Sequence, residues 1–397
     1  MIDLTTRRTI VVSCAPHITP YLKKEIETLG FQIESEEYTS ISLQGNFNDC
    51  IKLNLQLFTA SHVYLLLQSS ACVTMEEMYK IIKQISWEEI IKDDGYFSVH
   101  SVTDHPDVQN TMFLNVRIKD AIADRFMQKK DHRPDSGSEK KRAVIFVYWK
   151  NNEALIYLDT SGESLTKHGY RKIAMKAPLQ ESLGAALILA TQWDRKSPFI
   201  NPMCGSGTLA IEAAMIAIRK PPGLIRENFG FMHLLSFDEN YYNEVRNEIT
   251  QVVRPPQETD TIIATDNDRQ TIDAAKQNAM LAGVDHLIRF IVCEFGETPV
   301  PERMGIVMFN PPYGERLGTT AELKNLYASL GNFLKKKCPG YFGYIFTANP
   351  DLAKSVGLKP SAKKIFFNGS LECRLLEFEM FKGNRNEFKT MMKQLET

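Results

Sequence analysis

The stretch "MFNPPYGERL", residues 308–317, places two prolines and a tyrosine directly after an apolar run at 305–309. The run is typical of a buried strand, and the prolines end it because each lacks an N–H and has a fixed φ. Asn310 precedes a proline and is therefore held in an extended conformation. We expect Asn310 and Tyr313 on a stiff support at the carboxyl end of a strand, where open α/β sheets bind ligands. Taken alone, the stretch also fits a rigid loop with a chance tyrosine.

Length and composition limit the class of protein. The chain has 397 residues, 43% hydrophobic and 24% charged, which predicts a soluble globular protein of two or three domains. No apolar run approaches the ~20 residues of a membrane span, and the N-terminus has no leader-like apolar region. The seven cysteines show neither zinc-site nor disulfide spacing, so we expect no metal and a cytoplasmic location.

The formal net charge of −1 indicates that nucleic acid could be bound only through local basic clusters. Each such cluster is more often a solvated face than a phosphate contact. The candidates are Lys129, Lys130, His132 and Arg133; Lys140, Lys141 and Arg142; and Lys335 to Lys337.

The order of predicted elements changes near residues 160–176. Before this point, short strands and helices follow an α+β pattern; after it, strands and helices alternate, which predicts a doubly wound, mostly parallel sheet. In the first part we expect strands at 8–15 and 38–45, and helices at 19–29 and 48–58, the latter capped by Asn48. In the second part we expect helices at 178–192, 208–219 and 269–282, and strands at 197–201, 261–265, 288–292, 305–309, 341–347, 363–367 and 374–380.

A glycine loop follows the strand at 197–201. Gly205 and Gly207 let the backbone approach a ligand, and the helix after them favours negative charge at its N-terminus. Residues 205–210 also fit the weak dinucleotide pattern G-x-G-x-x-A, so a dehydrogenase is one interpretation. That pattern expects an acid ~20 residues on, whereas Asp266 follows only after an insertion at 220–258.

Other strand ends also carry polar or aromatic residues. Asp266 could bind both hydroxyls of a ribose, although Asp is also a common helix N-cap, a role that Asn267 or Asp268 could take instead. Glu294 follows the next strand, and Phe295 beside it could pack on a flat ring or simply belong to the core. A ribose, a base and a charged tail, with a second planar group near Asn310, suit S-adenosylmethionine plus a nucleobase better than NAD.

The chemistry at Asn310 follows from the electronic structure of a base amine, whose lone pair is delocalised into the ring. Acceptors at Asn310 Oδ1 and the Pro311 carbonyl would bind the two amine hydrogens and turn the lone pair toward the methyl group. Tyr313 would stack on the extruded base. Positioning and electrostatics carry this reaction, and it requires no metal or covalent nucleophile.

Several motifs together resemble the THUMP-domain RNA guanine-N2 methyltransferases, which depend on S-adenosyl-L-methionine. The nearest likeness is to the bacterial 23S rRNA type in its form with a single methyltransferase domain, over residues 1 to about 380. The motifs are DTSGESL at 159–165, GYR at 169–171, APLQESL at 177–183, the stretch 201–214, NPPYGERL at 310–317 and NGSLECR at 368–374.

The resemblance implies a ferredoxin-like domain at 1–60, a THUMP RNA-binding domain at 61–165 and a Rossmann-like methyltransferase domain at 166–397. It implies that Asn310, Pro311, Pro312 and Tyr313 hold the target base. It implies that the cofactor is bound by Pro178, Gln180, Glu181, Ser182, Asn201, Cys204, Gly205, Gly207, Thr208, Asp266, Asn267, Glu294, Phe295 and Asn310.

Three positions depart from the family's pattern. Asn201 and Glu294 stand where the family usually has aspartate, and both keep hydrogen-bonding ability. Residues 166–168 read Thr-Lys-His where the family has His-Lys-Arg, in a segment that we expect to contact RNA. The sequence leaves open a tRNA guanine-N2 enzyme, an adenine-N6 enzyme on RNA or DNA, and a non-catalytic RNA-binding assembly factor. It does not fix the modified nucleotide or the oligomeric state.

Overall fold

A computed structural model describes residues 4–106, 108–172, 179–253, 262–314 and 319–381. The chain forms two compact units. The first contains Met1–Ala15, Thr19–Lys167 and Pro221–Val252; the second contains Pro16–Ile18, His168–Lys220 and Val253–Thr397.

The first unit is built on one eight-stranded sheet, in the order β2-β3-β1-β4-β8-β7-β5-β6. Neighbours are antiparallel except for β5, which pairs in parallel with β6 and β7. The strands are β1 Arg8–Ser13, β2 Ile33–Glu37, β3 Ser40–Gly45, β4 His62–Ala71, β5 Tyr96–Thr103, β6 Asp135–Gly137, β7 Ala143–Lys150 and β8 Glu153–Asp159. The helices are α1 Thr19–Thr28, α2 Phe47–Gln56, α3 Met75–Gln84, α4 Thr111–Lys130 and α7 Glu239–Val252.

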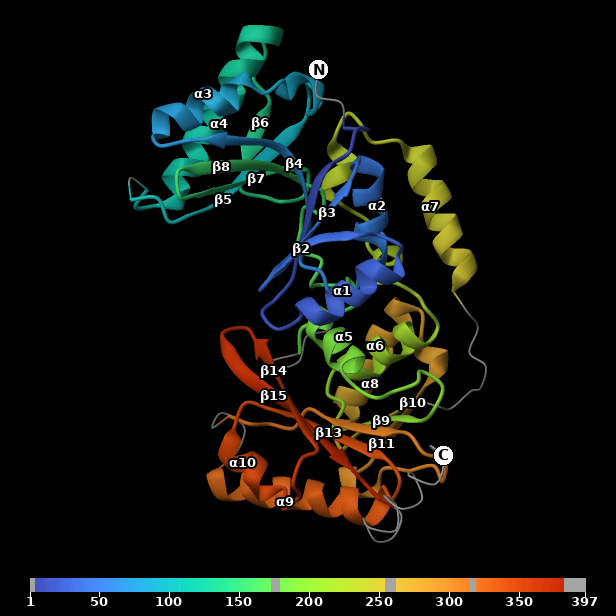
Figure 1. Cartoon of the computed structure of the whole chain (residues 1–397). Coiled ribbons are helices and arrows are strands. Elements are labelled where there is room, and N and C mark those ends of the chain that lie inside the picture. The colour runs from blue at the N-terminus through green and yellow to red at the C-terminus, as the bar shows by residue number, and fades with distance from the viewer. Residues whose placement is uncertain (1–3, 107, 173–178, 254–261, 315–318, 382–397) are drawn as a thin grey trace, which may run out of the picture. The chain divides into compact units, whose positions relative to one another are not determined.

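Helices α3 and α4 lie together over the β5-β7-β8 part of this sheet (Figure 1). Alternate strand residues such as Phe97, Ile145 and Val147 are fully buried, as are Ile82 of α3 and Ile118 of α4. The buried faces of the strands and of the helices therefore meet in one apolar layer. The α+β architecture expected for this part of the chain is confirmed.

Local signals explain two differences from the expected elements. Helix α2 is capped by Asn46 rather than Asn48, because Asn46 and Asp49 form a reciprocal capping box. Strand β2, with the sequence IESEE, was not expected because four of its five residues are exposed, which leaves no apolar alternation to recognise.

Residues 221–252, an insertion in the alternating part of the sequence, pack with the first unit. The amide of Phe231 donates to the carbonyl of Thr160 (2.9 Å), and that of Leu235 donates to Ile90 (2.9 Å). A side chain at Gly223 would meet the backbone of Leu55. Helix α7 in this insertion was not predicted from the sequence.

The second unit has a seven-stranded sheet in the order β11-β10-β9-β12-β13-β15-β14. Strands β11, β10, β9, β12 and β13 are parallel, and β15 runs antiparallel to both of its neighbours. The doubly wound, mostly parallel sheet predicted for this part is confirmed. The strands are β9 Phe199–Pro202, β10 Ile262–Asp266, β11 Ile288–Val292, β12 Ile306–Phe309, β13 Phe342–Thr347, β14 Ala362–Asn368 and β15 Leu371–Glu379.

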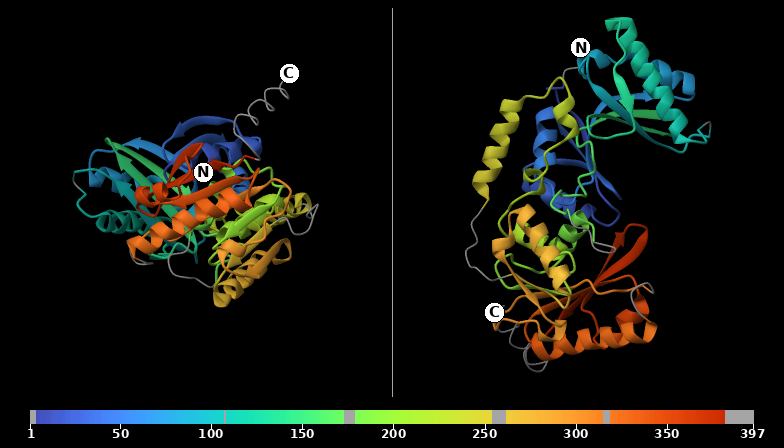
Figure 2. Two further views of the ribbon diagram at one scale, coloured as in Figure 1. Left: turned by 90° about the horizontal axis from the view of Figure 1, so that it is seen from below. Right: turned by 180° about the vertical axis from the view of Figure 1, so that it is seen from behind.

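Helices cover both faces of this sheet. Helix α9 packs Tyr327, Leu330 and Leu334 against a core that includes Val307 and Ile345. Helices α6 and α8 lie against the other face, over β9, β10 and β11, as the right-hand view of Figure 2 shows. The helices are α5 Glu181–Leu189, α6 Thr208–Ala217, α8 Arg269–Ala282, α9 Thr320–Lys337 and α10 Pro350–Ser355. Within the described ranges, no helix combines the length and apolarity that crossing a bilayer requires.

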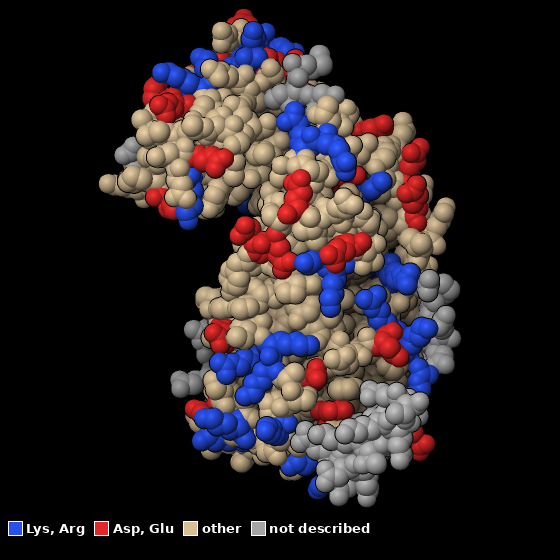
Figure 3. Space-filling view, viewed as in Figure 1, with Lys and Arg blue, Asp and Glu red and all other residues tan. Residues whose placement is uncertain are grey.

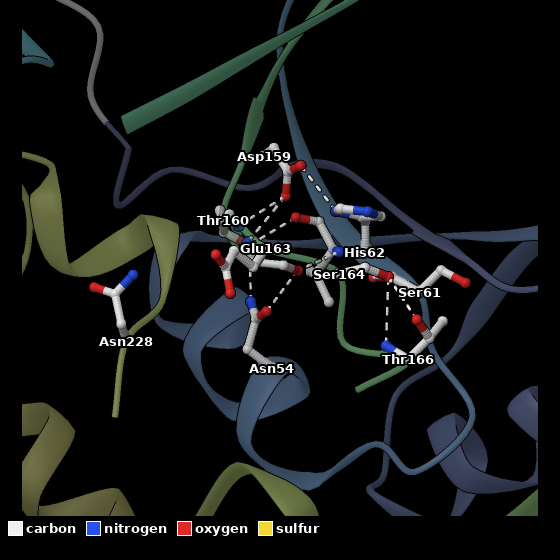
Figure 4. A network of polar contacts seen from close by, with 12 residues as sticks. Asn54, Ser61, His62, Asp159, Thr160, Glu163, Ser164, Thr166 and Asn228 are labelled. Carbon is white, nitrogen blue, oxygen red and sulfur yellow. Dashed lines mark hydrogen bonds and ion pairs between the residues drawn. The ribbon is translucent and has the colours of Figure 1, made fainter. Parts of the chain in front are cut away.

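The motif at 159–165 forms a buried polar network in the first unit (Figure 4). Asn54 of α2 donates to Thr160 Oγ1 (2.8 Å) and accepts from Ser161 Oγ (2.7 Å). Thr160 and Ser161 in turn bind the backbone of Val63 in β4, and Asp159 lies 2.8 Å from His62 Nδ1. The motif therefore joins α2, β4 and β8, which explains Asp159, Thr160 and Ser161 without a ligand.

We predict that Asn54→Ala lowers the stability of the first unit by about 2–3 kcal/mol, because each of the buried hydroxyls of Thr160 and Ser161 loses one hydrogen bond and keeps only its bond to Val63. The measurement is the thermal transition of that unit by calorimetry, with exposed Asn240→Ala on α7 as control. An unchanged transition for Asn54→Ala would show that the network does not stabilise the unit.

Candidate active site

Two strand ends of the second unit are joined by an asparagine. Strand β9 pairs in parallel with β10 and β12, so Asn201 lies beside Ala264 of one and the end of the other. Asn201 Nδ2 donates to the carbonyl of Met308 (2.9 Å), and the side chain is 1% exposed. The bond brings the end of β9 to the residues just before Asn310.

The glycine loop rests on Asp266. Gly205 has φ +55° and donates its N–H to Asp266 Oδ2 (3.1 Å). Asp266 Oδ1 accepts from the amide of Asp268 (3.2 Å), and Asp268 itself caps helix α8 through Gln270. The helix cap is therefore Asp268, which leaves Asp266 to organise the loop. A Cβ at Gly205 would meet nothing within 4 Å, so open space lies over this backbone.

Cys204 and Thr208, at the two ends of the glycine loop, are both buried. Burial raises the pKa of the Cys204 thiol far above its usual value, which keeps it neutral and packed rather than nucleophilic. Thr208 Oγ1 accepts from Arg171 Nη2 (2.8 Å), which also donates to the carbonyl of Leu179 (2.5 Å). Arg171 thereby holds the first residue of α6 to the segment that enters α5.

The start of α5 carries three predicted cofactor residues. Gln180 occupies the N-cap position, and Glu181 and Ser182 are buried behind it. Burial raises the pKa of Glu181, and nearby Arg171, 3.8 Å away, opposes that shift. Pro178 lies outside the described residues.

His168 and Tyr170 form a buried network with Glu212 of α6. His168 Nδ1 and Tyr170 Oη each lie 2.7 Å from Glu212 Oε1, and all three residues are almost completely buried. The expectation that residues 166–168 contact RNA is therefore wrong for His168, whose ring is 0% exposed. The histidine holds the segment before Arg171 against α6.

Glu294, Asn267 and Phe295 lie beyond the ends of β11 and β10. Asn267 Nδ2 donates to Glu294 Oε1 (3.1 Å) in an exposed pair. Phe295 is half-buried and packs edge-to-face on Phe309 (6.4 Å) and Phe333 (6.2 Å). One side of Phe295 therefore belongs to the core, which is one of the two roles that the sequence suggested for it.

Asn310 stands at the end of β12 with a buried acceptor. Within the described ranges, the Oδ1 atoms of both Asn310 and Asn201 are buried and have no hydrogen-bond partner. An unsatisfied buried acceptor costs about 1–3 kcal/mol, so each is poised to accept from a ligand donor. Pro311 is buried, and Pro312 is half-buried.

Tyr313 is held by the hairpin of β14 and β15. Its hydroxyl accepts from Asn368 Nδ2 (2.9 Å), and its ring meets Phe346 edge-on at 6.5 Å. Asn368, like Arg171, lies in a motif recognised in the sequence, but only the structure gives it this contact. The sequence offered no local signal, because 55 residues separate the two partners.

These residues fit S-adenosyl-L-methionine. Open space over Gly205, the N-terminus of α6 and the acceptor of Asn201 suit a zwitterionic tail, and Asp266 at the end of β10 suits a ribose. Asn310 Oδ1 lies at the next strand end, where a base amine could donate to it. These donors and acceptors match those that a nucleoside needs from a binding site.

Residues 168–377 match the family described as RMKL-like, methyltransferase domain, which is more than half of the chain. The chain belongs to this family. Its RMKL-like methyltransferase domain follows a THUMP domain at 72–159 and an RlmL ferredoxin-like domain at 9–64. The predicted family and fold class are confirmed, and the dehydrogenase interpretation of the glycine loop is wrong.

Named relatives of this RMKL-like chain are similar along its length. "Ribosomal RNA large subunit methyltransferase K/L" of Syntrophotalea carbinolica is 36% identical over 372 residues, covering 91% of this chain and 52% of that protein. The protein of that name from Legionella pneumophila (strain Lens) is 31% identical over 385 residues, covering 95% and 54%. The chain therefore spans about half the length of the curated relatives that it matches.

Two solved structures share the whole fold of this RMKL-like chain. The structure of SMU.472 complexed with SAH has a TM-score of 0.85 and 27% identity, covering 96% of this chain and 100% of that one. A predicted N6-adenine-specific DNA methylase from Listeria monocytogenes has a TM-score of 0.83 and 27% identity, covering 94% and 97%. The likeness extends over both units.

We predict that Gly205→Ala lowers affinity for S-adenosyl-L-methionine at least tenfold, about 1.4 kcal/mol, because its Cβ would enter the space over the loop. The positive φ adds strain of about 1–2 kcal/mol to folding. Gly30→Ala is the matched control, since Gly30 also has a positive φ (+85°) and open space around it. Titration calorimetry should separate them; equal affinities in both variants would place the cofactor elsewhere.

Proposed function

We propose that this protein transfers a methyl group from S-adenosyl-L-methionine to the exocyclic N2 amine of a guanine in RNA, with 23S rRNA as the substrate. The observation that carries the proposal is the buried, unpartnered Oδ1 of Asn310 at the end of β12, followed by Pro311, Pro312 and Tyr313. The names of the relatives, rRNA large subunit methyltransferases, support the substrate class.

S-adenosyl-L-methionine supplies the electrophilic methyl group when bound. Asn201, Gly205 and Gly207 hold its amino-acid tail, and Asp266 binds the ribose hydroxyls. Glu181, Ser182 and Cys204 wall the cofactor space, while Arg171 and Glu212 fix the helices that carry them. No side chain in this account forms a covalent bond to substrate, so the rate enhancement comes from positioning and electrostatics.

The base amine is positioned by the loop after β12. Asn310 Oδ1 and the Pro311 carbonyl accept hydrogen bonds from its two hydrogens, which turns the nitrogen lone pair toward the methyl group. When N2 gains the methyl group, it gives up one of these two protons to solvent water. Tyr313 stacks on the base, and its hydrogen bond to Asn368 keeps the ring from turning away. The target guanine must leave its stack to reach this loop, a cost of a few kcal/mol that is smallest in single-stranded RNA.

In this proposal, the front half of the chain binds the RNA. Its domains are a ferredoxin-like domain at about 1–60 and a THUMP domain at about 61–165, with the methyltransferase domain at about 166–397. The predicted basic clusters are weak candidates for RNA contacts: Lys130, Arg133 and Lys141 pair with nearby acids. Lys335 to Lys337 form the last turn of α9, where they complement the helix dipole. The proposal implies a cytoplasmic location.

We predict that the protein methylates 23S rRNA, and not 16S rRNA, tRNA or DNA, when each pool comes from cells lacking it and labelled S-adenosyl-L-methionine is the donor. Digestion to nucleosides and mass spectrometry should identify N2-methylguanosine. The same nucleoside in tRNA would keep the chemistry and move the substrate, whereas N6-methyladenosine would show that Asn310 holds adenine.

The variant Asn310→Ala tests the role of Asn310 in the same assay. It removes the buried acceptor and should abolish methyl transfer while calorimetry shows nearly unchanged cofactor affinity. Retained transfer would contradict the role of Asn310. A wild-type protein that binds RNA, does not bind the cofactor and transfers no labelled methyl group would instead indicate an assembly factor without catalysis.

A further inference from the structure

A cavity of about 250 Å³ opens beside the end of β13 in the second unit. It lies between helix α10 and the strands β13, β14 and β15, and it includes none of the residues assigned to the cofactor or the target base. Ala353, Leu358 and Leu376 give it an apolar floor, and Lys354, Lys363 and Arg374 stand around it. The volume is below the ~300 Å³ at which sites for whole small molecules begin, so it suits one part of a larger ligand.

The net charge of the cavity lining is positive, because the lining contains Lys354, Lys363 and Arg374 and one carboxylate, Glu372. Arg374 contacts Glu372 (3.3 Å), and Lys354 contacts Asp351 (2.8 Å), in exposed pairs that hold their partners weakly. Lys363 is exposed and forms no ion pair within the described ranges. Figure 3 shows Lys and Arg side chains gathered on the surface of β14, β15 and α10. A cationic rim over an apolar floor matches a nucleotide, whose base is flat and whose phosphate is anionic.

The cavity is next to the proposed catalytic loop in the sheet. Phe309 of β12 is paired with Ile345 of β13, so Thr347 at the cavity leaves the same sheet edge as Asn310, from the adjacent strand about 4.8 Å away. The ring of Tyr313 meets Phe346 of β13 edge-on, and the next residue, Thr347, lines the cavity. Successive strand residues point to opposite faces of a sheet. An RNA strand held at Tyr313 would therefore pass around this sheet edge to reach the cavity.

We propose that this cavity binds a nucleotide of the RNA substrate that neighbours the target guanine, with its base on the apolar floor and its phosphate against Lys363 and Arg374. The inference rests on the proposed function. A base extruded toward Tyr313 forces its neighbours out of regular stacking, and a second holding point at the same sheet edge would fix the strand on one side of the target.

Two charge variants test the phosphate contact in the full chain. Lys363→Gln and Arg374→Gln should each weaken binding of a labelled single-stranded guanosine-containing oligoribonucleotide severalfold, measured by fluorescence anisotropy. Each should also reduce the slope of log affinity against log salt by about 0.7, the loss of one phosphate contact. Lys276→Gln on α8 removes the same charge from an exposed lysine elsewhere and should leave both quantities unchanged.

Ala353→Trp tests the floor without a change of charge. It should fill the cavity and weaken RNA binding severalfold at an unchanged salt slope, while the thermal transition and the cofactor affinity stay as in the wild type. Wild-type affinity in Lys363→Gln, Arg374→Gln and Ala353→Trp, or no RNA binding by the wild type, overturns the cavity site. If the variants bind RNA more weakly than the wild type, but the wild type methylates no guanine, the cavity site is supported and the proposed function is refuted.

Discussion

The hydrogen bond from Asn201 Nδ2 to the carbonyl of Met308 is the contact on which the candidate active site depends. It joins the strand that begins the glycine loop to the strand that ends at Asn310, and it fixes the Asn201 amide with Oδ1 left to accept. An ionised aspartate at this position would have no proton to donate to that carbonyl. The asparagine therefore supplies a bond between the two strand ends of the candidate site that an ionised aspartate could not.

A second layer of buried polar groups keeps these strand ends in place. Asp266 receives two backbone amides, Arg171 links Thr208 to Leu179, and Glu212 receives His168 and Tyr170. Buried polar groups are costly unless satisfied, so such networks specify one arrangement. The site is thereby organised before any ligand arrives, which is the condition for catalysis by positioning alone.

The sequence predicted the ends of β9, β10 and β12 well, because alternating strands and helices force a parallel sheet whose carboxyl ends share one edge. Asn201, Asp266 and Asn310 were found in this way. The supporting residues were not found in this way. His168 was expected to contact RNA, and Asn368 was given no role, because their partners lie 44 and 55 residues away in the sequence. The packing of 221–252 with the first unit was also missed, because an insertion carries no sequence pattern that names its partner.

In the proposed mechanism, Asn310 Oδ1 accepts a hydrogen bond from the amine that is methylated. A crystal structure of the protein with S-adenosylhomocysteine and a guanosine-containing RNA measures this contact directly. We expect the guanine N2 within about 2.7–3.2 Å of Asn310 Oδ1, with the ring stacked on Tyr313. A bound guanine whose N2 lies away from Asn310, with Oδ1 bonded to some other group, would contradict the account.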